Sequence, residues 1–200
     1  PHLFFLMQKT SYFIPLRLVG SELCIRDRYW DGHQPATEPG NPNIMYGQRQ
    51  QGTLARIDMI TGEVTDVQPQ PRDKENYERF NWDAPILVSP HKPQRLYFGS
   101  QRVWKSEDRG DSWQPISGDL TRNQNRFDLP IMGSKQSWDN AWDVLAMSNY
   151  NTISAISESP IKPGLLYVGT DDGYIHISEN DGKSWRRIEV KKLAGAPSYA

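Results

Sequence analysis

A short acidic and aromatic segment offers the clearest candidate for chemistry in this 200-residue sequence. Two tryptophans and two aspartates fall within the run Ser137-Trp138-Asp139-Asn140-Ala141-Trp142-Asp143. Aromatic faces stack on sugar rings, and aspartate and asparagine side chains form hydrogen bonds with sugar hydroxyls. The segment is therefore suited to binding carbohydrate.

Asp139 and Asp143 form the one acid pair that we would assign to hydrolysis of a glycosidic bond. Glycosidases use two carboxyl groups that lie about 5 Å or about 6.5 to 9.5 Å apart, and residues four positions apart are neighbours in a helix. Trp138, Asn140 and Trp142 would then contact the substrate. The alternative, which we favour, is that the tryptophans anchor a loop and the aspartates are solvated or cap it.

Charge and residue composition exclude several other kinds of function. The 23 Lys and Arg residues nearly balance 24 Asp and Glu residues, so no basic field attracts nucleic acid. No apolar run is long enough to cross a membrane, and Cys24 has no partner for an internal disulfide. His33, His91 and His176 do not share a metal-ligand spacing. We expect no metal and no cofactor, with calcium left open at Asp171-Asp172-Gly173.

The composition of the rest of the chain, which would position the candidate site at residues 137–143, indicates an all-β fold. The apolar content depends on 7 Trp, 9 Tyr and β-branched residues, while 15 Gly and 15 Pro interrupt the sequence. This mixture favours short strands separated by turns over long helices.

An internal repeat organises these strands. Residues 89–100 align with residues 159–170 at an offset of 70 (159 minus 89), and residues 106–113 align with residues 178–185 at an offset of 72 (178 minus 106). A weaker copy precedes them, with a strand at Pro42 to Gly47 and a turn at residues 58–63. The predicted strands of the second and third copies are residues 84–88, 95–100, 102–106, 113–116, 153–158, 165–170, 173–178 and 185–190.

The second aligned motif is the Asp-box signature, Ser-x-Asp-x-Gly-x-Ser-Trp, with Asn in place of Asp in its later copy. Its members are Ser106, Asp108, Gly110, Ser112 and Trp113, and then Ser178, Asn180, Gly182, Ser184 and Trp185. A short Asp or Asn accepts hydrogen bonds from the backbone of its own turn, and Gly supplies a positive φ. We predict that the tryptophans pack between neighbouring sheets and that the motif is structural, not catalytic.

These motifs resemble large bacterial secreted β-propeller proteins of the glycosyl hydrolase-like and sortilin N-terminal-like groups. The residues that carry the resemblance are Asn81 to Ile86, Ser89 to His91, Leu96-Tyr97, Asp108 to Trp113 and Ile116 to Arg122. The resemblance implies a partial propeller of about three four-stranded antiparallel blades and an extracellular or periplasmic location. It leaves the activity open, because related propellers include sialidases, xyloglucanases and sorting receptors.

The expected organisation contains six parts. Residues 1–29 resemble translated adapter read-through and are predicted to be an artefact or a disordered extension, without a recognisable signal peptide. The remaining parts are a degenerate blade (30–80), an Asp-box blade (81–116), an insertion with a loop or short helix (117–152), a second Asp-box blade (153–190) and the start of a truncated element (191–200). Because the sequence begins with Pro1 and shows no closing pattern, we expect a fragment whose remaining blades complete a ring.

The functional hypothesis is a propeller scaffold that recognises a carbohydrate or peptide ligand. A glycosidase of the sialidase or xyloglucanase kind is the first alternative, although Arg126 to Pro130 does not match the sialidase Phe/Tyr-Arg-Ile-Pro motif. A sortilin-type protein-binding receptor is the second alternative.

Overall fold

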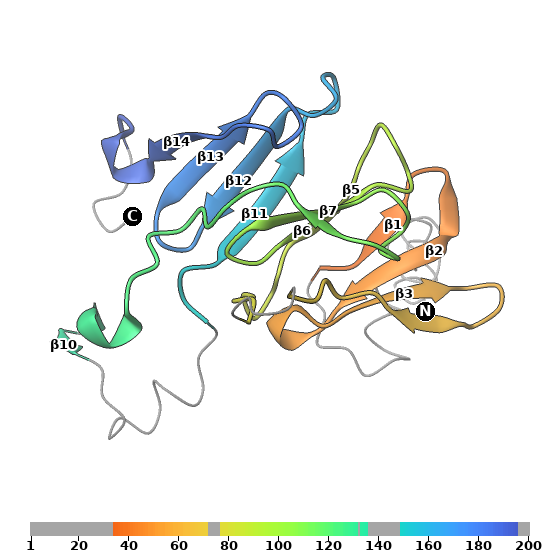
Figure 1. The fold of residues 1–200 in the computed structure, drawn as a ribbon, viewed down its shortest axis with the longest axis horizontal. Coiled ribbons are helices and arrows are strands. Elements are labelled where there is room, and N and C mark those ends of the chain that lie inside the picture. The colour runs from red at the N-terminus through yellow and green to blue at the C-terminus, as the bar shows by residue number, and fades with distance from the viewer. Residues whose placement is uncertain (1–33, 72–76, 132, 136–148, 196–200) are drawn as a thin grey trace, which may run out of the picture.

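Three antiparallel sheets of four strands each make up most of the structure (Figure 1). The structure is a computed structural model that describes residues 34–71, 77–131, 133–135 and 149–195, and the N-terminal extension predicted at residues 1–29 lies outside them. In every sheet the strands follow one another in chain order, so each sheet is a meander built from one continuous segment.

The strand bounds agree with the repeat found in the sequence. The first sheet contains β1 (Ala36–Glu38), β2 (Asn41–Gln48), β3 (Leu54–Asp58) and β4 (Val64–Asp66). The second contains β5 (Ile86–Val88), β6 (Leu96–Gly99), β7 (Val103–Ser106) and β8 (Gln114–Pro115). The third contains β11 (Ile153–Glu158), β12 (Leu166–Thr170), β13 (Tyr174–Ser178) and β14 (Arg186–Glu189). The eight strands predicted for the second and third copies are thereby confirmed, with shorter ends where turn residues leave the ladder.

The segment between the second and third sheets, for which the sequence predicted a loop or short helix, contains a hairpin that was not predicted and one helical turn. A short hairpin pairs β9 (Pro130–Ile131) with β10 (Ser134–Lys135), and a 3₁₀ turn, η2, precedes it at Arg126–Asp128. Two further 3₁₀ turns are η1 (Gln50–Gly52) and η3 (Val190–Lys192).

The three sheets lie face to face with a hydrophobic core between each neighbouring pair. Between the first two sheets, Tyr46 and Leu54 pack with Leu96, Phe98 and Trp104. Between the second and third sheets, the core consists of Tyr97, Val103, Leu120, Ile153, Leu166 and Val168. Because successive side chains of a strand point to opposite faces, β6 sends Leu96 and Phe98 into one core and Tyr97 into the other. The first strands also contact each other, β1 with β5 and β5 with β11, which makes them the innermost strands of the array.

A tryptophan fastens the second sheet to the first. The Trp113 indole Nε1 donates a hydrogen bond of 2.7 Å to the carbonyl of Val67, the residue that follows β4. Gly110 lies so close to Val67 that a Cβ at this glycine would approach the valine side chain to 2.9 Å. The indole ring packs against Phe98, with 6.2 Å between the ring centroids.

The same joint recurs between the second and third sheets. Trp185 donates through Nε1 to the carbonyl of Ile116, the residue that follows β8, at 3.1 Å. A Cβ at Gly182 would approach the Ile116 side chain to 2.5 Å. The second and third sheets are therefore each held to the preceding sheet by one indole and one glycine, which contact the residue after the last strand of that sheet.

Candidate functional site

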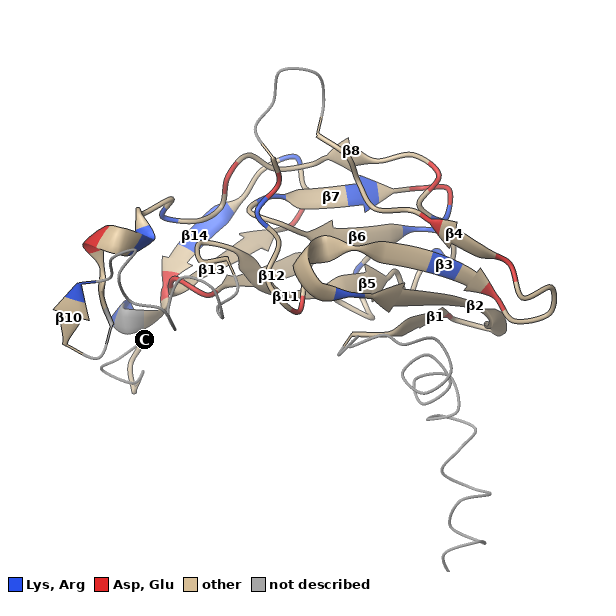
Figure 2. Cartoon of the chain, turned by 90° about the horizontal axis from the view of Figure 1, so that it is seen from below, with Lys and Arg blue, Asp and Glu red and all other residues tan. Residues whose placement is uncertain are grey.

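The two ends of the sheets carry different structures. At one end, the chain turns between the third and fourth strands, and we call the two longer of these turns, residues 106–113 and 178–185, the corner turns. At the opposite end, which we call the loop end, lie the turns from β6 to β7 and from β12 to β13 and the connections between sheets. Acidic residues lie mostly in turns and at strand ends, as Figure 2 shows.

In the first corner turn, two side chains bond to the backbone of the turn. The Ser106 hydroxyl accepts a hydrogen bond from Gly110 N at 2.8 Å and donates to Asp108 Oδ1 at 2.8 Å. Asp108 also accepts from the Ser112 amide at 2.9 Å and from the Ser112 hydroxyl at 2.6 Å. Although burial alone would raise the pKa of Asp108, these hydrogen bonds hold it below its ordinary value.

The second corner turn repeats this arrangement with an amide in place of the carboxylate. Ser178 accepts from Gly182 N at 2.9 Å, and Asn180 Oδ1 accepts from Ser184 N at 2.9 Å. The polarity of one bond is reversed, since Asn180 Nδ2 donates to the Ser184 hydroxyl at 2.8 Å. An amide and a carboxylate thus serve the same turn.

Replacing Asp108 with Ala should lower the free energy of unfolding by about 1 to 2 kcal/mol, because the Ser112 amide and hydroxyl lose their acceptor. Asp108→Asn should cost less than about 0.5 kcal/mol, since Asn180 makes the equivalent bonds in this same chain. Urea unfolding of the two variants beside the unmodified chain measures this difference. A larger loss for Asn than for Ala would contradict the structural role.

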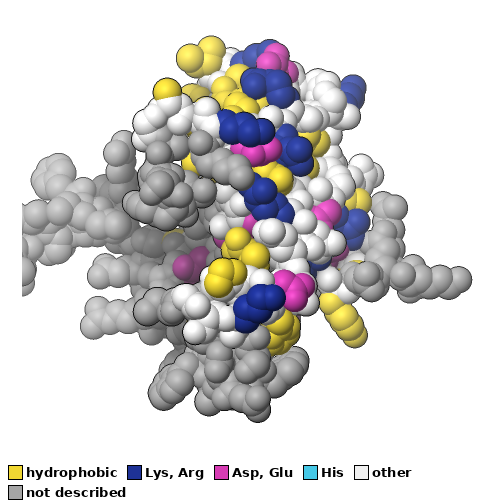
Figure 3. Space-filling model, turned by 90° about the vertical axis from the view of Figure 1, so that its left-hand side faces the viewer, with side chains coloured by type: hydrophobic (Ala, Val, Ile, Leu, Met, Phe, Trp, Pro, Cys, Tyr) yellow, Lys and Arg dark blue, Asp and Glu magenta, His cyan; other side chains and the backbone are white. Residues whose placement is uncertain are grey.

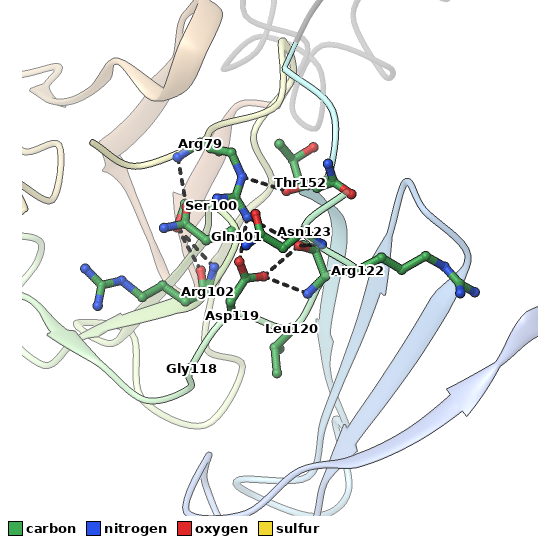
Figure 4. A network of polar contacts seen from close by, with 12 residues as sticks. Arg79, Ser100, Gln101, Arg102, Gly118, Asp119, Leu120, Arg122, Asn123 and Thr152 are labelled. Atoms are coloured by element: carbon green, nitrogen blue, oxygen red, sulfur yellow. Dashed lines mark hydrogen bonds and ion pairs between the residues drawn. The ribbon is translucent and has the colours of Figure 1, made fainter. Parts of the chain in front are cut away.

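At the loop end, Arg79 lies at the centre of a polar network (Figure 4). Its backbone amide donates to Gln101 Oε1 at 2.8 Å, and its guanidinium donates to Asp119 Oδ2 at 2.6 Å and to Thr121 Oγ1 at 3.3 Å. Burial would raise the pKa of Asp119, but hydrogen bonds from Thr121 and Arg79 lower it below its ordinary value. The network ties the segment before β5 to the segment after β8.

A second group of polar contacts joins this network to the third sheet. Thr152 donates through its hydroxyl to Asp171 Oδ2 at 2.7 Å and through its amide to Asp171 Oδ1 at 2.9 Å. Arg122 N donates to Asp172 Oδ2 at 2.6 Å, and the Arg122 guanidinium lies 4.0 Å from the centre of the Tyr174 ring. Hydrogen-bond donors of the protein thus already occupy both carboxylates of the Asp171-Asp172 pair. Among the described residues, no group of three or more His, Cys, Asp or Glu side chains could hold a metal ion.

A pocket of about 310 Å³ opens at the loop end of the first two sheets. Polar and aromatic side chains line it: Gln51, Gln68, Gln70, Tyr77, Glu78 and Asn149. Tyr77 is 90% exposed, whereas the side chain of Glu78 is buried and forms an ion pair with Arg102. Exposed amides and an aromatic ring beside a fixed carboxylate can bond hydroxyls and stack on a flat apolar face.

The acidic and aromatic segment at residues 137–143 lies outside the described residues, so its role in binding or hydrolysis stays a prediction. Trp138, Asp139, Asn140, Trp142 and Asp143 fall within residues 136–148, outside the described part of the chain. Asn149 directly follows that segment, and it lines the pocket and donates to the Phe80 carbonyl at 3.2 Å.

No pattern in the sequence indicated the pocket. Its lining residues come from η1, from the connection between the first two sheets and from Asn149, and they belong to no shared motif. The available signal was the polar and proline-rich composition of residues 68–71, in a connection much longer than a hairpin turn.

His176 is a buried titratable group of β13 that contacts the segment after β8. Its Nε2 lies 2.7 Å from the Leu120 carbonyl, and its ring meets the edge of Tyr174. Burial lowers the pKa of His176 below 6.5, an effect that the nearby Arg187 reinforces and that Asp172 and the Leu120 hydrogen bond oppose.

Protonation of His176 should therefore destabilise the fold. With a folded pKa below the unfolded value of about 6.5, its contribution to stability is complete above that pH and is lost as the pH falls toward the folded pKa. Urea midpoints measured at pH 7.5 and 5.5 should differ, and His176→Gln should reduce the difference. An identical pH dependence in the variant would show that another group controls it.

The fold and the joints define the class of this protein: the three sheets are consecutive blades of a β-propeller. The first strands of the sheets lie innermost, and tryptophans in the outer turns hold neighbouring sheets together. Blades arranged around a central axis pack in this way. None of the helices formed by the described residues is long and apolar enough to span a membrane.

One solved structure supports the β-propeller fold. An ancestral GH74 enzyme is 11% identical over 80% of this chain with a TM-score of 0.51, and the chain spans 18% of that enzyme's length. YCF48 from Cyanidioschyzon merolae is 14% identical with a TM-score of 0.45, and the match covers 82% of this chain and 38% of YCF48. The GH74 xyloglucanase from Xanthomonas campestris is 21% identical with a TM-score of 0.45, and the match covers 83% of this chain and 24% of the xyloglucanase. No protein-family model and no curated protein matches the sequence.

Proposed function

We propose that this chain forms part of an Asp-box propeller scaffold that recognises carbohydrate at the loop end of its blades. The observation that supports this most directly is the pocket in which exposed Tyr77 stands beside the amides of Gln51, Gln68 and Gln70. Sugars present hydroxyls to amides and C–H faces to aromatic rings, so this set of side chains suits them. None of the lining residues within the described part of the chain is basic.

Replacing Tyr77 with Ala should weaken binding to a glycan found on an oligosaccharide array by about tenfold, which corresponds to about 1.4 kcal/mol. The loss follows from removal of the stacking face, and titration calorimetry measures it. Ile161→Ala is the matched control, because Ile161 is equally exposed at 91% and lies in the third sheet's turn at the other end. Equal binding by both variants, or capture of peptides and no glycans, would contradict a carbohydrate site here.

A glycosidase is the second candidate function, and Asp139 and Asp143 are the only catalytic residues that we propose for it. Asp139→Asn and Asp143→Asn in the full-length protein, assayed on a panel of polysaccharides, separate hydrolysis from simple binding. Unchanged hydrolysis would remove both residues from candidacy.

A sortilin-type receptor is the third candidate, and it predicts peptide capture that added sugars do not compete with. The resemblance to secreted propellers further leads us to propose a location outside the cytoplasm for the whole protein. Fractionation of cells that express the full-length protein tests that location.

A further inference from the structure

Gln51, one of the residues that line the pocket at the loop end, has an unusual backbone conformation. Its φ is 57° and its ψ is 34°, in the left-handed region that a residue with a long side chain rarely adopts. Residues in this region keep their conformation only where the surrounding structure holds it, and they are frequent at ligand-binding sites. The Gln51 side chain is exposed, so its own packing does not account for the conformation.

The neighbouring glycine shows what holds Gln51 in place. Gly52 is buried, has a φ of 81° and lies so close to the Phe80 ring that an added Cβ would be 2.1 Å from Phe80 Cγ. Phe80 is 3% exposed and packs against Phe98 of β6, with 5.2 Å between the ring centroids. The contact between Gly52 and Phe80 therefore fixes η1, and Gln51 with it, against the connection that leads to the second blade.

Tyr77 is held through the residue that follows it. The side chain of Glu78 is 2% exposed, and its Oε1 accepts a hydrogen bond from Arg102 Nε at 2.9 Å. Its Oε2 accepts from the Ser100 hydroxyl at 2.5 Å and from the Trp104 indole Nε1 at 3.2 Å. Glu78 thus anchors the segment to the second blade, while the Tyr77 side chain next to it is 90% exposed. A site with fixed backbone on both segments loses less entropy when a ligand binds.

Two glutamine side chains of this pocket have no hydrogen-bond partner among the described residues. They are Gln51 in η1 and Gln68 in the connection that follows β4. Gln70 differs from them, because its Nε2 donates to the Gln68 carbonyl at 3.4 Å. A primary amide offers two donors and one acceptor, so Gln51 and Gln68 can bind a ligand from two separate segments of the chain.

An acetamido group matches this pair of side chains. Its amide is planar and trans, so its N–H and its C=O point in opposite directions, and it needs an acceptor on one side and a donor on the other. Two glutamines from different segments provide both. The methyl of the acetamido group needs an apolar surface, which Pro69, Pro71 and Phe80 provide in the same pocket. A hydroxyl in its place would leave that surface uncovered.

We propose that the pocket at the loop end binds sugars that carry an acetamido group, with Gln51 and Gln68 bound to the acetamido amide and Tyr77 stacked on the sugar ring. This inference rests on the carbohydrate function proposed above. The pocket volume of about 310 Å³ is at the lower end of the range for small-ligand sites, so it accommodates a short stretch of a glycan. A ligand without the acetamido group leaves the amides of the pocket unpaired, which is the basis of strong discrimination.

Two uncharged trisaccharides, triacetylchitotriose and cellotriose, test the proposal by titration calorimetry with the unmodified chain. They have the same linkage and differ in an acetamido group or a hydroxyl at one carbon of each ring. Uncharged probes are needed because Lys and Arg gather on the side of the molecule that carries β14, where Arg186 and Arg187 are exposed (Figure 3). An anionic glycan could bind there by charge alone. Triacetylchitotriose should bind at least about tenfold more tightly than cellotriose.

Three variants assign this preference to residues. Gln51→Ala combined with Gln68→Ala should weaken binding of triacetylchitotriose about tenfold and leave binding of cellotriose unchanged, because only the acetamido group loses its partners. Gln70→Ala is the matched control from the same pocket and should change neither affinity. Tyr77→Ala should weaken both sugars by the same factor, because it removes the stacking face that they share.

The outcomes separate this inference from the function on which it rests. Equal affinity for the two sugars, weakened in both by Tyr77→Ala, would overturn the acetamido specificity and leave the carbohydrate site in place. A preference that persists without both glutamines would overturn the roles of Gln51 and Gln68. Binding of neither trisaccharide would overturn the specificity as well, and an oligosaccharide array on which no glycan binds would then overturn the proposed function too.

Discussion

Trp113→Ala should lower the free energy of unfolding by about 3 kcal/mol, near the lower end of the range for aromatic truncations in protein cores. The indole is partly buried, so the loss of packing against Phe98 and Val67 is smaller than for a fully enclosed ring. The change also leaves the Val67 carbonyl without its 2.7 Å donor, which adds about 1 kcal/mol or more. Urea unfolding followed by circular dichroism measures the change.

Two companion variants separate these contributions. Trp113→Phe keeps a ring but removes the donor, and it should cost about half as much as Ala. Trp82→Ala is the control, because Trp82 is 38% exposed and its contact to Gln48 uses the backbone carbonyl, which the variant retains. A loss below about 1 kcal/mol for Trp113→Ala would mean that the indole does not fasten the second blade to the first.

Gly182→Ala should destabilise the chain by a similar amount, about 3 kcal/mol, for a steric reason. The residue has a φ of +85°, which costs an L-residue about 1 to 2 kcal/mol. Its Cβ would come within 2.5 Å of Ile116 Cδ1 and 2.8 Å of Ile116 Cβ, a contact that requires the joint to open. The free energy of unfolding from urea titrations is again the measurement.

The chain supplies a matched control for the steric part. Gly62 has a similar φ of +74°, but no atom lies within 4 Å of an added Cβ, so Gly62→Ala should show the backbone cost alone. Combining Gly182→Ala with Ile116→Ala should recover part of the loss in a double-mutant cycle. If Gly182→Ala costs no more than Gly62→Ala, the close approach of the two blades is absent in solution.

Most of the fold could be predicted from the sequence, because the repeat shows both where the strands lie and which residues form the turns between them. The pairs Leu96-Tyr97 and Leu166-Tyr167 stand in equivalent second strands, as their equal distances from Pro93 and Pro163 predicted. The degenerate first copy also forms a full blade, in which Asp58 accepts from the amides of Ile60 and Thr61 and thereby replaces the missing motif. Local hydrogen bonding was sufficient to predict these elements.

The candidate site could not be predicted in the same way, because it depends on contacts between distant segments. The Arg79 to Asp119 ion pair spans 40 residues, and the pocket brings Gln51 and Asn149 together from different connections. Neither belongs to a repeated motif, so no periodicity marks them. The difference in charge between Arg109 and Asp181 was visible in the aligned turns, but their partners Glu38 and Lys105 lie in other strands and could be found only from the structure.

The way in which neighbouring blades attach has a practical consequence for engineering. Val67 and Ile116 hold the next blade in the same way, although the connections that follow them, from Asp66 to Ile86 and from Pro115 to Ile153, differ greatly in length. The attachment of neighbouring blades is therefore insensitive to the length of the connection that follows it. Foreign recognition segments could be grafted into the longer connection. The protein would then bind new ligands without redesign of the contacts between blades.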